Sequence, residues 1–197
     1  MVSKRQLFLN HLAQTTDAPL MLEVERGEGI YLFDPDGKKY IDLISGIGVS
    51  SLGHLYPEVV EAVQEQSKKY MHTLVYGEFV MSPQVELAAL ISENLPDPLE
   101  TVYFVNSGSE ATEGAMKLAK RFTGRPEIIA ARKAYHGSTQ GAASLMYPTE
   151  FTQAFHPLLP GINHIEFNDE NDLEKITSKT ACVIVETVQA ECGLQKP

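Results

Sequence analysis

The second half of the sequence alternates short apolar segments with helical segments, and this alternation restricts the chain to few folds. Strands are expected at four apolar segments, residues 101–105, 127–131, 163–167 and 181–185. Helices are expected between them, at about 109–122, after Gly137 and at about 169–177. Strands that are joined by helical crossovers form a mostly parallel sheet. We therefore predict an α/β fold.

The first fifty residues have the pattern of a small antiparallel unit. Apolar segments at 29–33 and 39–43 flank the turn sequence Asp34-Pro35-Asp36-Gly37, which predicts a β-hairpin. Two helices are expected after the hairpin, at about 57–70 and from Ser82 to just before Pro96.

The charge of the chain excludes several classes of partner. Sixteen Lys and Arg residues face 26 Asp and Glu residues, so the net charge is −10. Surfaces that bind nucleic acid or acidic membranes are basic, and we expect neither partner. No apolar run approaches the roughly 20 residues of a membrane span, and Asn10 and His11 interrupt the only candidate signal core. We expect a cytoplasmic protein.

The cysteines and histidines give no metal or disulfide pattern. Cys182 and Cys192 are too few for a disulfide framework and lack the second pair of a zinc site. No two of the six histidines have the i, i+4 spacing that places two ligands on one helix face. We expect reduced thiols and no metal.

A turn of small residues, Ser107-Gly108-Ser109, follows the segment 101–105 and begins a helix. The first turn of a helix offers free N–H groups and a positive dipole end, which suit a phosphate. Gly108 permits a close backbone approach, while the hydroxyls of Ser107 and Ser109 can cap the helix or donate to phosphate oxygens. An ordinary helix cap has the same pattern, so both interpretations stay open.

Other nucleotide and nucleophile motifs fit less well. Gly46-Ile47-Gly48 lacks the third glycine of the dinucleotide fingerprint, and the chain has no GxxxxGKS or GxxxxGKT string. Residues 137–141 have the outline of a nucleophile elbow, but Thr139 stands where a Ser is required. An α/β hydrolase that uses this turn is kept as an alternative, which an esterase assay would test.

Two further loops follow expected strands. Tyr135 and His136 come after the strand at 127–131, and an aromatic ring there can stack on a flat heterocycle or pack in the core. Glu186 and Glu191 come after the strand at 181–185. Their carboxylates can orient a cationic substrate or an Arg, or be solvated loop acids.

Three segments together resemble the class III (omega) aminotransferases, which use pyridoxal 5'-phosphate on the fold-type I scaffold: NSGSEA at 106–111, YHGS at 135–138 and VETVQAECG at 185–193. Residues 27–54 are also similar to that family. The resemblance implies transfer of an amino group between an amine or amino acid and a 2-oxo acid, in a homodimer whose interface lies near residues 45–54. It also implies that residues 1–50 belong to a small domain and 51–197 to the first part of the large cofactor-binding domain.

The resemblance implies a role for each matching residue. Ser107, Gly108 and Ser109 match the turn that binds the cofactor phosphate. Tyr135 matches the aromatic residue on the pyridine ring, with His136 beside it, and Glu191 and Ser138 match positions that face the substrate.

The sequence also departs from the family pattern. Ser138 stands where the acetylornithine, ornithine and 4-aminobutyrate aminotransferases carry an Arg that holds a substrate carboxylate, and Thr187 stands where Pro is usual. The family's Asp that pairs with the pyridinium nitrogen and its Schiff-base Lys lie beyond VETVQAECG, so we expect these 197 residues to be the first half of a longer polypeptide and inactive alone, with no catalytic residue in this chain. A non-catalytic binding or regulatory module is the other alternative.

Overall fold

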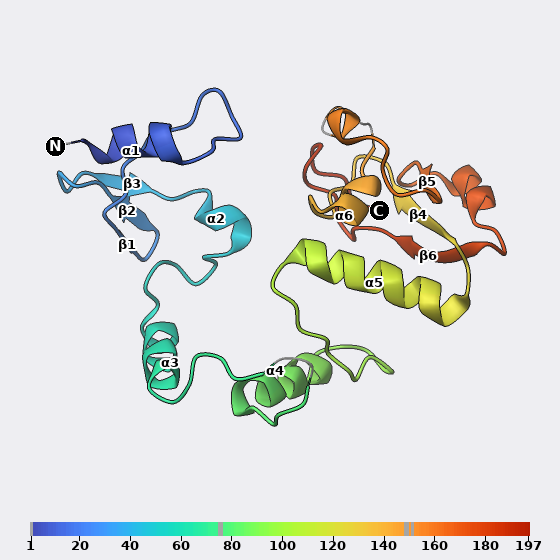
Figure 1. Cartoon of the computed structure of the whole chain (residues 1–197), viewed down its shortest axis with the longest axis horizontal. Coiled ribbons are helices and arrows are strands. Elements are labelled where there is room, and N and C mark those ends of the chain that lie inside the picture. The colour runs from blue at the N-terminus through green and yellow to red at the C-terminus, as the bar shows by residue number, and fades with distance from the viewer. Residues whose placement is uncertain (1, 75–76, 148–149, 151) are drawn as a thin grey trace. The chain divides into compact units, whose positions relative to one another are not determined.

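The computed structural model describes residues 2–74, 77–147, 150 and 152–197 (Figure 1). The chain divides into two compact units, Met1–Met81 and Ser82–Pro197. The expected boundary after residue 50 concerns the domains of the family's complete fold and stays a prediction.

The first unit contains a three-stranded antiparallel sheet in the order β1-β2-β3. Its elements are α1 (Lys4–His11), β1 (Arg26–Glu28), β2 (Tyr31–Phe33), β3 (Lys39–Ile41), α2 (Ser45–Gly48) and α3 (Pro57–Ser67). The expected hairpin is confirmed as β2 and β3, with Leu32 opposite Tyr40. Asp34 closes its turn, because its Oδ1 accepts hydrogen bonds from the N–H groups of Asp36 and Lys38.

Asp42 fixes the chain just after this sheet. Its Oδ1 accepts hydrogen bonds from the N–H groups of Ile44 and Ser45, and its Oδ2 lies 2.7 Å from Nε2 of His54. These bonds, with the one from Ser45 the strongest, lower the pKa of Asp42 below its ordinary 3.8. The carboxylate thereby fixes the backbone at the start of α2, whose residues Gly46 and Ile47 have left-handed backbone angles.

The second unit contains a parallel sheet in the order β5-β4-β6, joined by crossovers, so the α/β prediction is confirmed. Its elements are α4 (Ser82–Glu93), α5 (Gly108–Thr123), β4 (Glu127–Ala131), α6 (Gln140–Ser144), η2 (Gln153–Phe155), β5 (Ile162–Ile165), η3 (Glu170–Lys175) and β6 (Thr180–Ile184). β4 is the central strand, and its last four residues, Ile128 to Ala131, are fully buried. A strand covered on both faces has such a continuous apolar sequence.

The core of this unit lies on both faces of β4. On one face Met116 of α5 packs with Ile128, Ala130 and Leu145. On the other face Ile129 and Ala131 pack with Ile165. The alternation along β4 follows the two-residue period of a strand, so α5 covers one face of the sheet.

The predicted strand at 101–105 is wrong. These residues form no regular element, and the sheet order contains no strand from this part of the chain. Tyr103 is 77% exposed and Phe104 is 40% exposed. An apolar segment becomes a strand only where a neighbouring strand pairs with its backbone, and within the described residues this segment has no such neighbour. The turn at Ser107 therefore starts from an irregular segment.

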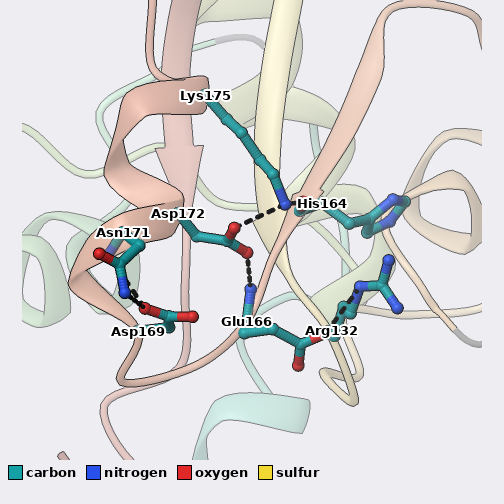
Figure 2. A network of polar contacts seen from close by, with 7 residues as sticks. All are labelled: Arg132, His164, Glu166, Asp169, Asn171, Asp172 and Lys175. Carbon is teal, nitrogen blue, oxygen red and sulfur yellow. Dashed lines mark hydrogen bonds and ion pairs between the residues drawn. The ribbon is translucent and has the colours of Figure 1, made fainter.

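The end of β5 is held by a polar network (Figure 2). Lys175 of η3 donates to the carbonyl oxygen of His164 at 3.1 Å and forms an ion pair with Asp172 at 2.8 Å. Asp172 accepts a hydrogen bond from the N–H of Glu166, whose own carboxylate pairs with Arg132 at 3.1 Å. The network ties η3 to the carboxyl ends of β4 and β5, because Arg132 follows β4 and Glu166 follows β5.

Candidate functional site

The predicted phosphate turn forms the first turn of α5 and is closed by reciprocal hydrogen bonds. Ser107 Oγ accepts from the N–H of Glu110 at 3.1 Å, and Glu110 Oε2 accepts from the N–H of Asn106 at 2.7 Å. This is a variant of the capping box that we call the capping box below, in which Glu110 binds the N–H of Asn106, one residue before the cap residue Ser107. The N–H groups of Gly108 and Ser109 come earlier in the same turn, where a helix provides no carbonyl partner. A Cβ on Gly108 would meet nothing within 4 Å, so the turn is open on this side.

The first turns of α5 contact the loop that carries the other predicted cofactor residues. Ser109 Oγ accepts a hydrogen bond from the N–H of Ser138 at 3.0 Å. Thr112, one turn further along the helix, donates its hydroxyl to the carbonyl oxygen of His136 at 2.9 Å. The structure therefore brings the phosphate turn and the YHGS segment together, although no strand precedes the phosphate turn.

Glu113 extends this contact to α6. Its Oε1 accepts hydrogen bonds from the hydroxyl of Thr139 at 2.7 Å and from the N–H groups of Gly141 and Ala142 at 2.8 and 3.2 Å. Burial alone would raise the pKa of Glu113, but these three bonds and the charge of Lys117 together outweigh it and lower the pKa. The carboxylate is thus ionised at neutral pH and caps the helix from outside.

Two glycines allow this close approach. A Cβ on Gly137, whose φ is +124°, would stand 2.1 Å from Ser109 Oγ. A Cβ on Gly141 would stand 2.3 Å from Glu113 Oε2. Both distances are far below van der Waals contact: a side chain at position 137 would meet the backbone of Ser109, and one at position 141 would displace the carboxylate of Glu113.

A cavity of about 400 Å³ lies beside this contact. Tyr135, Ser138 and Glu191 all line it, so the structure brings together three residues that the sequence assigned to ring and substrate binding. Tyr135 is 47% exposed, and its ring is therefore available for stacking rather than enclosed in the core. The lining also includes Lys133 and Glu150, which the sequence did not single out.

Two buried polar atoms at the site have no hydrogen-bond partner within the described residues: Nε2 of His136 and Oε2 of Glu186. Burial lowers the pKa of His136, which favours its neutral form. Burial also raises the pKa of Glu186, with a further increase from the charge of Glu191, while a hydrogen bond from the N–H of Tyr135 opposes the shift. Unpaired buried polar atoms are costly, so their presence fits a site built for a polar ligand.

Glu186 joins the ends of two neighbouring strands. It follows β6, while Tyr135 follows β4, and the two strands pair in parallel. Their carboxyl ends therefore meet at one edge of the sheet, where α/β proteins bind ligands. Because Glu186 is half-buried, it is not a solvated loop acid.

Other kinds of site find no support in the described part of the chain. Among these residues no group of three or more His, Cys, Asp or Glu side chains could hold a metal ion. None of the helices described is both long enough and apolar enough to cross a membrane.

Comparison with known proteins identifies the family to which this arrangement belongs. The sequence model of the class-III aminotransferases matches residues 12–197. The chain is a class-III aminotransferase sequence. Acetylornithine aminotransferase from Methanopyrus kandleri is 46% identical over 174 residues, which cover 87% of this chain and 44% of that protein. A putative LysW-aminoadipate semialdehyde/glutamate semialdehyde transaminase from Pyrococcus furiosus is also 46% identical, covering 88% of this chain and 46% of that protein.

Solved structures of aminotransferases show the same fold. The ornithine aminotransferase from Toxoplasma gondii has a TM-score of 0.85 at 26% identity and covers 100% of this chain and 48% of its own. An (S)-enantioselective omega-transaminase from Thermomicrobium roseum has a TM-score of 0.86 at 28% identity, covering 98% of this chain and 50% of its own. The fold-type I prediction is therefore confirmed, and the chain spans about half the length of these relatives.

Proposed function

We propose that this chain binds pyridoxal 5'-phosphate at the junction of α5 and the YHGS segment and forms part of an enzyme that transfers amino groups between an amine or amino acid and a 2-oxo acid. The hydrogen bond from Ser138 to Ser109 carries the proposal, because it places the phosphate turn beside the loop of Tyr135. Relatives named as aminotransferases, and a neighbouring structure described with the cofactor at its active site, support the choice of cofactor.

We assign a role in cofactor binding to each residue of the proposed site. The N–H groups and hydroxyls of Ser107, Gly108 and Ser109 bind the phosphate at the positive end of α5. The ring of Tyr135 covers one face of the pyridine ring, and neutral His136 offers a polar atom beside it. When bound, the cofactor supplies an electron-accepting ring for amino transfer.

The cavity lining limits the substrate. Ser138 offers one hydroxyl at its position in the cavity, so we assign a donor that does not need a bidentate carboxylate clamp there. Glu150, Glu191 and Lys133 provide two acidic groups and one basic group in the same cavity. We expect the working enzyme to be a cytoplasmic homodimer.

The family's Schiff-base Lys and pyridinium-binding Asp have no match among these residues, so we expect the isolated 197-residue chain to bind cofactor without transaminating. Amino transfer by the purified chain would contradict this expectation.

Binding of pyridoxamine 5'-phosphate tests the proposed site, because this form of the cofactor has no aldehyde and cannot react with surface lysines. We expect Ser109→Ala and Tyr135→Ala to weaken binding by about tenfold each, the loss of a charged hydrogen bond or of a stacked ring. Ser178→Ala and Tyr103→Ala are matched controls outside the site, and Tyr103 is 77% exposed. Equal affinity in all five proteins would overturn the proposal.

A further inference from the structure

Glu113 stands outside the predicted site but connects the elements that form it. Its Oε1 accepts three hydrogen bonds, from Thr139, Gly141 and Ala142. The last two come from N–H groups in the first turn of α6, where the helix supplies no carbonyl partner. One carboxylate on α5 therefore satisfies the start of α6 and the hydroxyl of the residue before it.

The position of Glu113 on α5 links its contact with α6 to the phosphate turn at the start of the same helix. Ser109, Thr112 and Glu113 lie three and four residues apart, so they share one face of the helix. That face holds the chain from His136 to Ala142 through the hydroxyl of Ser109, the hydroxyl of Thr112 and the carboxylate of Glu113. Tyr135 comes directly before this stretch, while the phosphate turn is the start of the same helix.

We propose that Glu113 is a positioning residue. Through its hydrogen bonds to the first turn of α6, it sets the distance and angle between the phosphate turn of α5 and the ring of Tyr135. The inference rests on the proposed function, because it assumes that both elements hold one cofactor. Glu113 itself lies one turn behind the phosphate turn and touches neither phosphate nor ring. Removing it leaves the hydrogen bonds at Ser107 and Glu110 intact, but takes away one of the three contacts by which α5 holds the chain from His136 to Ala142.

Two ligands separate positioning from binding. Inorganic phosphate needs only the turn of α5, whereas pyridoxamine 5'-phosphate needs the turn and Tyr135 together. We expect Glu113→Ala to weaken pyridoxamine 5'-phosphate about tenfold and to reduce its induced circular dichroism, while phosphate affinity stays within about twofold. Glu113→Gln keeps an oxygen acceptor and should restore most of both signals. Glu110→Ala, which opens the capping box itself, should weaken both ligands together.

A substitution at Gly141 disturbs the contact between Glu113 and α6 from the side of α6. Its backbone is helical, so Ala fits the chain, but the added Cβ would stand 2.3 Å from Glu113 Oε2 and push the carboxylate away. We expect Gly141→Ala to weaken pyridoxamine 5'-phosphate alone and to have no further effect in the Glu113→Ala background, where the clash is gone. Such a double-mutant cycle isolates the coupling between the two positions. Additive losses would overturn the inference.

Hydrogen exchange at the amides of Gly141 and Ala142 gives a readout without ligand and should rise in Glu113→Ala. Unchanged exchange overturns the inference even if the variant binds poorly. If the unaltered chain binds pyridoxamine 5'-phosphate and Glu113→Ala matches it in affinity and dichroism, the inference alone fails. If the unaltered chain binds neither ligand, the proposed function fails and the inference fails with it.

Discussion

The N–H of Ser138 donates a hydrogen bond to the hydroxyl of Ser109 at 3.0 Å, across 29 positions of the sequence. Gly137 precedes Ser138, and the bond exists because Gly137 has no side chain between the two segments. The hydroxyl of Ser109 accepts this bond and keeps its own hydrogen for a further acceptor. The same contact therefore fixes the loop and leaves the hydroxyl hydrogen of Ser109 available to a phosphate.

Gly137→Ala should disrupt this contact. Its φ of +124° is unfavourable for Ala, and the Cβ would stand 2.1 Å from Ser109 Oγ. We expect the free energy of unfolding to fall by about 1–3 kcal/mol, measured by chemical denaturation, with weaker pyridoxamine 5'-phosphate binding. Gly114→Ala is the control, because that Cβ meets only Tyr103 at 3.9 Å and replaces a helical glycine. It should leave stability unchanged or raise it by up to about 1 kcal/mol.

Met116→Ala should remove the side chain by which α5 covers the sheet. Met116 is 2% exposed and packs with Ile128 and Leu145. Truncating a buried Met to Ala costs about 2–5 kcal/mol of unfolding free energy, because transfer energy is lost and a cavity remains. Leu118 on the same helix is 67% exposed, so Leu118→Ala should cost less than about 1 kcal/mol. Similar losses in both variants would contradict the assignment of Met116 to the core.

Stability should fall as the pH drops below the ordinary pKa of histidine. Burial, followed by the charges of Arg132 and Lys175, lowers the pKa of His164 below 6.5, against an opposing hydrogen bond with the carbonyl of Leu145. The unfolded chain therefore binds the proton more tightly than the folded chain. The contribution of neutral His164 to the free energy of unfolding is complete above pH 6.5 and is lost as the pH falls through the lowered pKa.

His164→Gln should flatten this pH dependence in denaturation measured between pH 7.5 and about 5. His136 titrates in the same direction, since burial lowers its pKa too, so part of the slope should remain. An NMR titration should show both rings gaining their protons below pH 6.5. A midpoint above 6.5 for His164 would contradict the burial of this ring.

Asp42→Ala should loosen the entrance to α2 in the first unit. The N–H groups of Ile44 and Ser45 lose their acceptor, and His54 loses its hydrogen-bond partner. We expect faster hydrogen exchange at these two amides, with Asp36→Ala as a control in the exposed hairpin turn. The pKa of Asp42 is lowered from 3.8, so its stabilising effect is present above that pH and is lost as the pH falls through the lower value. In Asp42→Ala, the free energy of unfolding should lack the part of its decrease at low pH that comes from protonation of Asp42.

The sequence predicted the parallel sheet well because its strands have local signals. β4, β5 and β6 begin within a residue of their expected positions, since continuous apolar segments between helical ones are typical of buried parallel strands. The segment 101–105 has the same apolar character, but its conformation depends on a partner strand, which no local pattern specifies. Helix α1 was missed because it lacks an apolar stripe, although Ser3 Oγ caps it by accepting from the N–H of Gln6.

The site was predicted in its residue types but not in its connections. Ser109, Tyr135 and Ser138 were recognised from motifs, and the structure brings their segments together. Glu113 was missed because its partners are backbone N–H groups of α6, which have no sequence signature. The available signal was the four-residue spacing that places Ser109 and Glu113 on one helix face. This spacing indicates a contact role for Glu113 only once the loop at residues 136–142 is known to lie against that face.

The interlock of α5 with residues 137–141 sets a rule for recombining this protein with its relatives. A chimera that takes the helix from one parent and the loop from another combines a helix and a loop that did not evolve together, at Gly137, where a methyl group would meet the backbone of Ser109, and at Gly141, where it would displace the carboxylate of Glu113. Crossover points should therefore fall before residue 106 or after α6, so that helix and loop are inherited as a single block.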